Sequence, residues 1–194
     1  TTTTISDEQF DFAKALIREE GLEDRIEILN EDYRLLQGQY DKIVSVEMVE
    51  AVGRKFLPSF FQKLNSLLKP NGLVMLQAIT IADQRFDSYS RNEDFIQKHI
   101  FPGGFLPSMS LMSDIISKQT EFIIRDVRDI GLDYAQTLAH WREAFLEKQH
   151  ELHELGYDEE FKNLWLYYFG YCEGGFLERR ISAQQLLASK APHL

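Results

Sequence analysis

Hydrophobic side chains recur along this chain at two alternating spacings. Short runs of aliphatic and β-branched residues predict strands over residues 25–30, 40–46 and 73–80. Between them, apolar positions three and four residues apart predict helices over residues 6–21 and 57–68. Strands that alternate with helices are typical of an α/β protein. We therefore expect a doubly wound sheet in which the strand over residues 40–46 is parallel and buried.

The pattern changes after residue 80. Residues 81–120 begin with a polar and aromatic stretch that is too long for a simple connection between strands. We expect a helical insertion there, closing with a helix over residues 108–118. The remaining pattern predicts a strand over 121–129, long helices over 134–155 and 158–179, and a final strand over 181–190. We expect residues 1–194 to form one domain.

Glu50 is the first candidate for chemistry, because it lies just where the strand over residues 40–46 must end. In open α/β sheets, ligands bind beyond the carboxyl ends of the strands, so a carboxylate at this place is expected to face a site. The alternative is a structural role, in which Glu50 favours the dipole of a helix N-terminus.

Composition narrows the classes of partner. The net charge of −10 and the pI near 5.0 argue against nucleic acid as the main ligand. The single cysteine, Cys172, excludes an internal disulfide and fits a reducing cytosol. No stretch approaches the roughly 18 to 20 apolar residues of a membrane span. The five histidines, which include His193, show no metal-ligand spacing, and we expect no metal site.

Several segments together carry a resemblance to a known family. The strand at Tyr40 and the Lys-Pro-Asn-Gly turn at residues 69–72 are similar to the second half of an S-adenosylmethionine-dependent methyltransferase. The more specific segments are VSVEMVEAVG (44–53), FIQKHIFPGG (95–104) with LPS (106–108), DYAQTL (133–138) with Trp141, and WLYYFGYCEGGFLE (165–178). These resemble the cyclopropane-fatty-acyl-phospholipid synthase family, which includes the mycolic acid cyclopropane synthases.

The resemblance implies a fold and an activity. It implies a Rossmann-like methyltransferase sheet with a helical, lipid-binding insertion. The implied reaction moves a methylene group from S-adenosylmethionine to the double bond of an unsaturated phospholipid acyl chain and forms a cyclopropane ring. The enzyme would be cytoplasmic and peripherally associated with the inner face of the membrane. Two alternatives stay open: a methyltransferase of this family that stops at methyl transfer to an acyl chain or an amine, and a non-catalytic lipid-binding module.

The beginning of the chain is interpreted as a truncation. Residues 1–5 are β-prone and run directly into a helix cap at Ser6, without an initial methionine. The first strand and the glycine-rich loop of the resembled fold would lie before Thr1, so we expect this fragment to be inactive by itself. The exposed sheet edge that this leaves predicts pairing with another strand, in a homo-oligomer or with a segment of a neighbour.

The resemblance also implies residues that bind S-adenosylmethionine. Thr4, Ile5 and Gln9 match the family's Thr-Leu-Ser-x-x-Gln segment, which holds the ribose and methionine side of the cofactor. Tyr33 stands where the family places an aromatic ring against the adenine. Val46, at the end of its strand, is assigned to the same cofactor site.

A second set of residues is implied for bicarbonate, which serves the family as a base. Glu50 matches the glutamate that binds this ion, Ile79 a main-chain contact to it, and Tyr134 a tyrosine that donates a hydrogen bond. Gln77 stands where the family has histidine, so it can donate a hydrogen bond but cannot pass a proton. The aromatic side chains expected to line the acyl chain and stabilise a cation are Phe101, Tyr167, Tyr168 and Phe176.

Overall fold

The structure, a computed structural model, describes residues 1–192 and divides the chain after Tyr40 into two compact units. His193 and the end of the expected domain lie outside the described residues. Each unit is described by itself.

The first unit is a small α/β element of residues 1–40. It consists of β1 (Thr2–Thr4), α1 (Asp7–Glu19) and β2 (Ile28–Asn30), and the two strands pair in parallel. Ser6 caps α1, because its side-chain hydroxyl accepts a hydrogen bond from the Gln9 amide. The predicted helix is confirmed, the predicted strand over residues 25–30 is shorter than expected, and the β-prone opening residues do form a strand.

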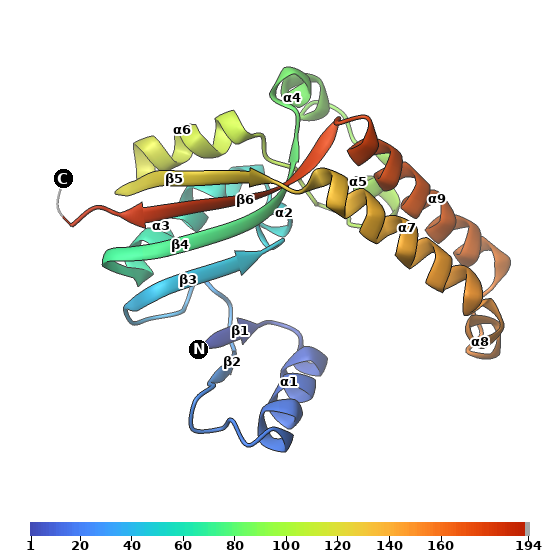
Figure 1. Cartoon of the computed structure of the whole chain (residues 1–194), viewed down its shortest axis with the longest axis horizontal. Coiled ribbons are helices and arrows are strands. Elements are labelled where there is room, and N and C mark those ends of the chain that lie inside the picture. The colour runs from blue at the N-terminus through green and yellow to red at the C-terminus, as the bar shows by residue number, and fades with distance from the viewer. Residues whose placement is uncertain (193–194) are drawn as a thin grey trace. The chain divides into compact units, whose positions relative to one another are not determined.

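The second unit is built on a four-stranded sheet with the order β3-β4-β6-β5 (Figure 1). The strands are β3 (Tyr40–Val46), β4 (Leu68–Ile81), β5 (Phe122–Asp129) and β6 (Ile181–Lys190). β6 runs antiparallel to both neighbours, from Leu73 opposite Ser189 to Ile81 opposite Ile181 on the β4 side. The last predicted strand is thus confirmed, but the sheet is mixed and not parallel throughout.

β3 lies at an edge of this sheet, so its predicted burial is wrong. Val44 is 63% exposed and Val46 is 55% exposed. A run of β-branched residues predicts a strand correctly. It does not reveal whether that strand has a neighbour on each side, since that depends on pairings distant in the sequence.

The Lys-Pro-Asn-Gly turn lies where the sequence predicts it, between α3 (Leu57–Leu67) and the part of β4 that pairs with β6. Asn71 has a φ of 63°, in the left-handed region. A Cβ atom on Gly72 would come within 2.8 Å of the Leu68 side chain and of the Lys69 carbonyl oxygen. The chain can therefore reverse this tightly only with glycine at position 72.

Helices cover the sheet and extend beyond it. α3 and α6 (Met109–Gln119) pack against each other. Both helices lie beside the sheet (Figure 1). Between Ile81 and α6, in the predicted helical insertion, lie the short helices α4 (Asp83–Tyr89) and α5 (Phe95–His99). Other short helices are α2 (Val49–Val52) and the 3₁₀ helix η1 (Arg54–Phe56), which follow β3, and α8 (Gln149–Glu154), which follows α7.

The long helices α7 (Gly131–Glu147) and α9 (Glu159–Leu177) lie side by side at one end of the sheet (Figure 1). Both were predicted as helices, although α7 ends earlier than residue 155 and α8 follows as a separate helix. Among the helices of residues 1–192, none is both long enough and apolar enough to cross a membrane.

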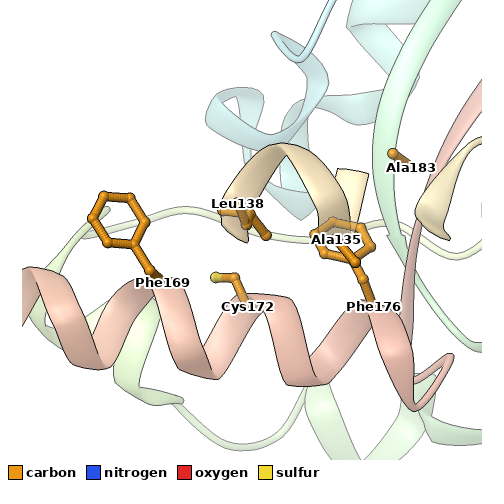
Figure 2. Close-up of a cluster of buried hydrophobic side chains, with 6 residues drawn as sticks. All are labelled: Ala135, Leu138, Phe169, Cys172, Phe176 and Ala183. Carbon is orange, nitrogen blue, oxygen red and sulfur yellow. The ribbon is translucent and has the colours of Figure 1, made fainter. Parts of the chain in front are cut away.

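A buried cluster joins α7, α9 and β6 (Figure 2). Ala135 and Leu138 come from α7, and Ala183 from β6; α9 contributes Phe169, Cys172 and Phe176. Burial raises the pKa of the Cys172 thiol to about 12, as expected for a small hydrophobic core residue. The cluster therefore fixes α7, and with it Tyr134, relative to the sheet.

We predict that Leu138→Ala lowers the free energy of unfolding by about 3 kcal/mol, because it leaves a cavity in this cluster. Leu146→Ala, on the same helix but 40% exposed, is the matched control and should cost under about 1 kcal/mol. Urea unfolding followed by circular dichroism measures both values. Equal losses for the two variants would show that the α7–α9 cluster does not stabilise the unit.

Candidate active site

The chain turns sharply where β3 ends, and this turn presents the Glu47 side chain. Glu47 has a φ of 50°, and its amide donates a 2.8 Å hydrogen bond to the Gln77 carbonyl oxygen of β4. A positive φ is costly for a residue with a Cβ atom. The main chain at position 47 is thus held against β4 in a conformation that favours glycine.

The carboxylate of Glu47 is the centre of a polar network. Its Oε1 accepts a 2.9 Å hydrogen bond from Gln77 Nε2, and its Oε2 accepts a 2.8 Å hydrogen bond from the Tyr134 hydroxyl. Gln185 Nε2, on β6, donates to Gln77 Oε1 at 2.9 Å and so orients that amide toward Glu47. Two polar side chains, from β4 and α7, thereby bind the Glu47 carboxylate, and Gln185 from β6 supports one of them.

Sequence reasoning missed Glu47 and Gln185 as site residues. Glu47 lies inside the segment VSVEMVEAVG, three residues before Glu50, so the motif contained the signal but Glu50 alone was singled out. Gln185 lies in an alternating strand without a motif. Only its register opposite Gln77 reveals its role.

Glu50, on α2, contacts one of its predicted companions. Its Oε1 accepts a 2.5 Å hydrogen bond from the Ile79 amide, so Glu50 and the Ile79 main chain are brought together directly. Its Oε2 is buried and has no hydrogen-bond partner among the described residues. Burial raises the pKa of Glu50, the Ile79 amide opposes that rise, and the nearby charge of Glu47 adds to it.

Tyr134 lies in the first turn of α7 and stacks on Phe176, with ring centroids 4.8 Å apart. Burial raises the pKa of the Tyr134 hydroxyl, and the hydrogen bond to Glu47 raises it further. The phenol is therefore a neutral donor over the physiological range. Trp141, one of the motif residues, forms an edge-to-face pair with the Tyr134 ring, with centroids 6.3 Å apart.

The other predicted aromatic residues differ in their surroundings. The rings of Phe101 and Tyr168 form an edge-to-face pair with centroids 6.3 Å apart. The ring of Tyr167 forms such a pair with Phe95, with centroids 4.6 Å apart. Burial raises the pKa of Tyr168 to about 12, and the charges of Cys172 and Glu47 contribute to the rise. Glu47 therefore acts electrostatically on Tyr168 as well as on Tyr134.

The predicted cofactor residues of the first unit gather near the carboxyl ends of its strands. Parallel pairing places Thr4 opposite Asn30. The Thr4 hydroxyl donates to Gln9 Oε1 at 3.0 Å, and Ile5 is 78% exposed. Tyr33, three residues after β2, is partly buried, which raises its pKa.

A hydroxyl, an amide and an aromatic ring at such an edge fit a nucleoside cofactor. Val46 belongs to the second unit, at the carboxyl end of β3. Within residues 1–192, no group of three or more histidine, cysteine, aspartate or glutamate side chains is placed to hold a metal ion.

Comparison with solved structures identifies the fold. The mycolic acid cyclopropane synthase CmaA1, solved with SAH and CTAB, matches with a TM-score of 0.83 at 24% identity, over 97% of this chain and 68% of that one. The fold is thus the Rossmann-like fold of S-adenosylmethionine-dependent methyltransferases. Residues 1–186 match the mycolic acid cyclopropane synthetase family. The chain belongs to that family.

Two curated relatives are similar in sequence to this chain. It is 42% identical over 175 residues to the tuberculostearic acid methyltransferase UfaA1 of Mycobacterium tuberculosis, covering 90% of this chain and 41% of that protein. It is 38% identical over 187 residues to the cyclopropane-fatty-acyl-phospholipid synthase of Escherichia coli K12, covering 96% and 46%. The chain therefore spans less than half the length of these relatives.

We predict that Glu50→Gln stabilises the fold at neutral pH. A raised pKa means that the folded state favours the protonated carboxyl group. Its contribution to stability is full below the unfolded pKa and declines as the pH rises toward the folded pKa. The glutamine keeps an oxygen for the Ile79 amide and does not ionise. Its gain in melting temperature should therefore be larger at pH 8 than at pH 4, and a gain independent of pH would contradict this assignment.

Proposed function

We propose that the protein carrying this chain transfers a methylene group from S-adenosylmethionine to the double bond of an unsaturated phospholipid acyl chain, closing a cyclopropane ring. The observation that supports this function best is the cluster of Glu47, Tyr134 and Gln77 at the carboxyl end of β3. It combines an anionic acceptor with aromatic rings, the two features that a reaction through a carbocation requires.

The chemistry explains why such groups are needed. S-adenosylmethionine, when bound, supplies an electrophilic methyl group. As the alkene π electrons form a bond to that carbon, its bond to sulfur would break, the sulfide would leave with that electron pair, and the positive charge would pass to the acyl chain. Aromatic faces such as those of Tyr134 and Phe176 stabilise a nearby cation. Ring closure then requires a base that removes one proton from the new methyl group, so that the C–H electron pair forms the third ring bond.

A second candidate is a transfer that ends in a methyl-branched acyl chain. Gln77 favours it, because the amide at this position hydrogen-bonds to Glu47 and cannot carry a proton as histidine can. The relative that is 42% identical bears the name tuberculostearic acid methyltransferase. An amine substrate and a non-catalytic lipid-binding role are the remaining alternatives.

We extend the proposal to the place of action. The acyl chain would be reached at the surface of a membrane, by a cytoplasmic and peripherally bound protein. Exposed aromatic side chains on the α7–α9 pair, such as Trp141 and Tyr167, suit a lipid surface. The exposed edge at β3 supports a homo-oligomer in which another strand covers it.

Mass spectrometry of lipids from cells that express the protein tests the function. We expect unsaturated phospholipid chains to gain the mass of one CH₂ group. NMR of the product then separates the two candidates, because ring closure removes the olefinic proton signal, whereas a branched product that forms by proton loss keeps a C=C bond. Unchanged acyl chains, with the protein expressed and folded, would refute lipid methyl transfer and favour the lipid-binding alternative.

Tyr134→Phe is expected to lower turnover on the order of 10²-fold, because its hydroxyl positions the Glu47 carboxylate and a positioned acid–base group contributes about that much. The ring stack on Phe176 survives this change, and only the hydroxyl that binds Glu47 is lost. Tyr157→Phe is the matched control, because it also removes one hydroxyl, from an exposed tyrosine that stacks on Phe161 and does not bind Glu47. Steady-state kinetics with unsaturated phospholipid vesicles measure both, and equal turnover of the Tyr134 variant and the native protein would contradict this role.

A further inference from the structure

The residues that the family resemblance assigns to bicarbonate are already engaged within the chain. The Ile79 amide donates to Glu50 Oε1. The Gln77 amide and the Tyr134 hydroxyl donate to the two carboxylate oxygens of Glu47. A bicarbonate ion would need these same donors, so the observed arrangement does not fit it.

The charges of the site also oppose an additional anion. Glu47 and Glu50 lie near enough for the charge of Glu47 to raise the pKa of Glu50, which burial has already raised. One oxygen of Glu50 is buried without a hydrogen-bond partner among the described residues. A bicarbonate ion placed here would have to overcome the repulsion of Glu47 and compete with Glu47 and Glu50 for the donors that these residues already bind.

The backbone at position 47 indicates that the side chain there has a task. The φ of 50° is a conformation in which glycine is the default residue and glutamate is strained. The two hydrogen bonds to the carboxylate offset this cost. Each carboxylate oxygen still has a second lone pair that can accept a proton or a further hydrogen bond.

We propose that Glu47 takes the place of bicarbonate in this protein and is the base that receives the proton from the methylated acyl chain. The inference rests on the proposed function. In the step, one C–H bond of the new methyl group breaks, its proton passes to a Glu47 oxygen, and its electron pair closes the ring or, for a branched product, forms a C=C bond. The proton then returns to solvent, so no co-reactant is required.

Two variants of Glu47 separate its charge from its hydrogen bonds. Glu47→Gln keeps the shape, since its oxygen accepts from Gln77 and its amide donates to the Tyr134 hydroxyl, but it removes the charge. Glu47→Gly removes the side chain, relaxes the left-handed backbone, and frees Gln77 and Tyr134 to bind an external anion. Both are expected to fold, and melting temperatures verify that.

The first experiment measures binding and not activity. ¹³C-labelled bicarbonate is added to the native protein and to both variants, and broadening of its NMR signal reports binding. We expect no broadening with the native protein and clear broadening with Glu47→Gly. Ultraviolet titration should also show that Tyr134 ionises at a lower pH in Glu47→Gln, because the neighbouring charge is gone. The proposal would be overturned if the native protein bound bicarbonate and neither Glu47 variant changed that binding.

The second experiment measures turnover in buffer freed of carbon dioxide. The native protein should keep its full rate, and Glu47→Gln should lose on the order of 10²-fold in turnover. Added bicarbonate should restore part of the activity of Glu47→Gly and leave the native rate unchanged. A native rate that depends on bicarbonate, or full activity of Glu47→Gln, would refute a base role for Glu47. If the native protein modifies no lipid at all, the proposed function fails, whereas the binding experiment still decides whether Glu47 holds the anion site.

Discussion

The arrangement of the second unit's polar site depends on one partly buried contact, the Glu47 carboxylate between its two hydrogen-bond donors Gln77 and Tyr134. Glu47 directly follows β3, Gln77 lies in β4, and Tyr134 lies in the first turn of α7. A partly buried carboxylate is unfavourable unless donors compensate for the lost water. The requirement for two donors therefore fixes the register of β3 against β4 and the position of the first turn of α7 together.

Apolar packing next to this contact offsets the free-energy cost of the partly buried carboxylate. The cluster of Figure 2 holds α7 against α9 and β6, and Phe176 from that cluster stacks on the ring of Tyr134. Hydrophobic burial supplies the stability, because it is roughly proportional to the apolar area removed from water. The hydrogen bonds then specify where the phenol oxygen lies, since an unpaired buried donor or acceptor costs more than a satisfied one gains.

The residue pattern predicted much of this fold for identifiable reasons. Local signals, such as the cap at Ser6, the turn at Gly72 and the β-branched run of β3, depend on neighbouring residues and were found. The edge position of β3 and the antiparallel direction of β6 depend on pairings across the chain and were not. The same limit applies to the site. Glu50 and Tyr134 were identified through motifs, but the bond between Glu47 and Tyr134 spans 87 positions and has no local signature.

The glutamine at position 77 is best understood together with Glu47. A charged histidine and a carboxylate each favour the charged form of the other. The two groups would then titrate together and share a proton. Gln77 is uncharged at every pH, and Gln185 fixes which end of its amide faces Glu47. The carboxylate is consequently the ionisable group of this hydrogen-bonded pair, and Tyr134, whose pKa is raised, is a neutral donor to it. The replacement of histidine by glutamine is therefore physically consistent with a base that belongs to the chain itself.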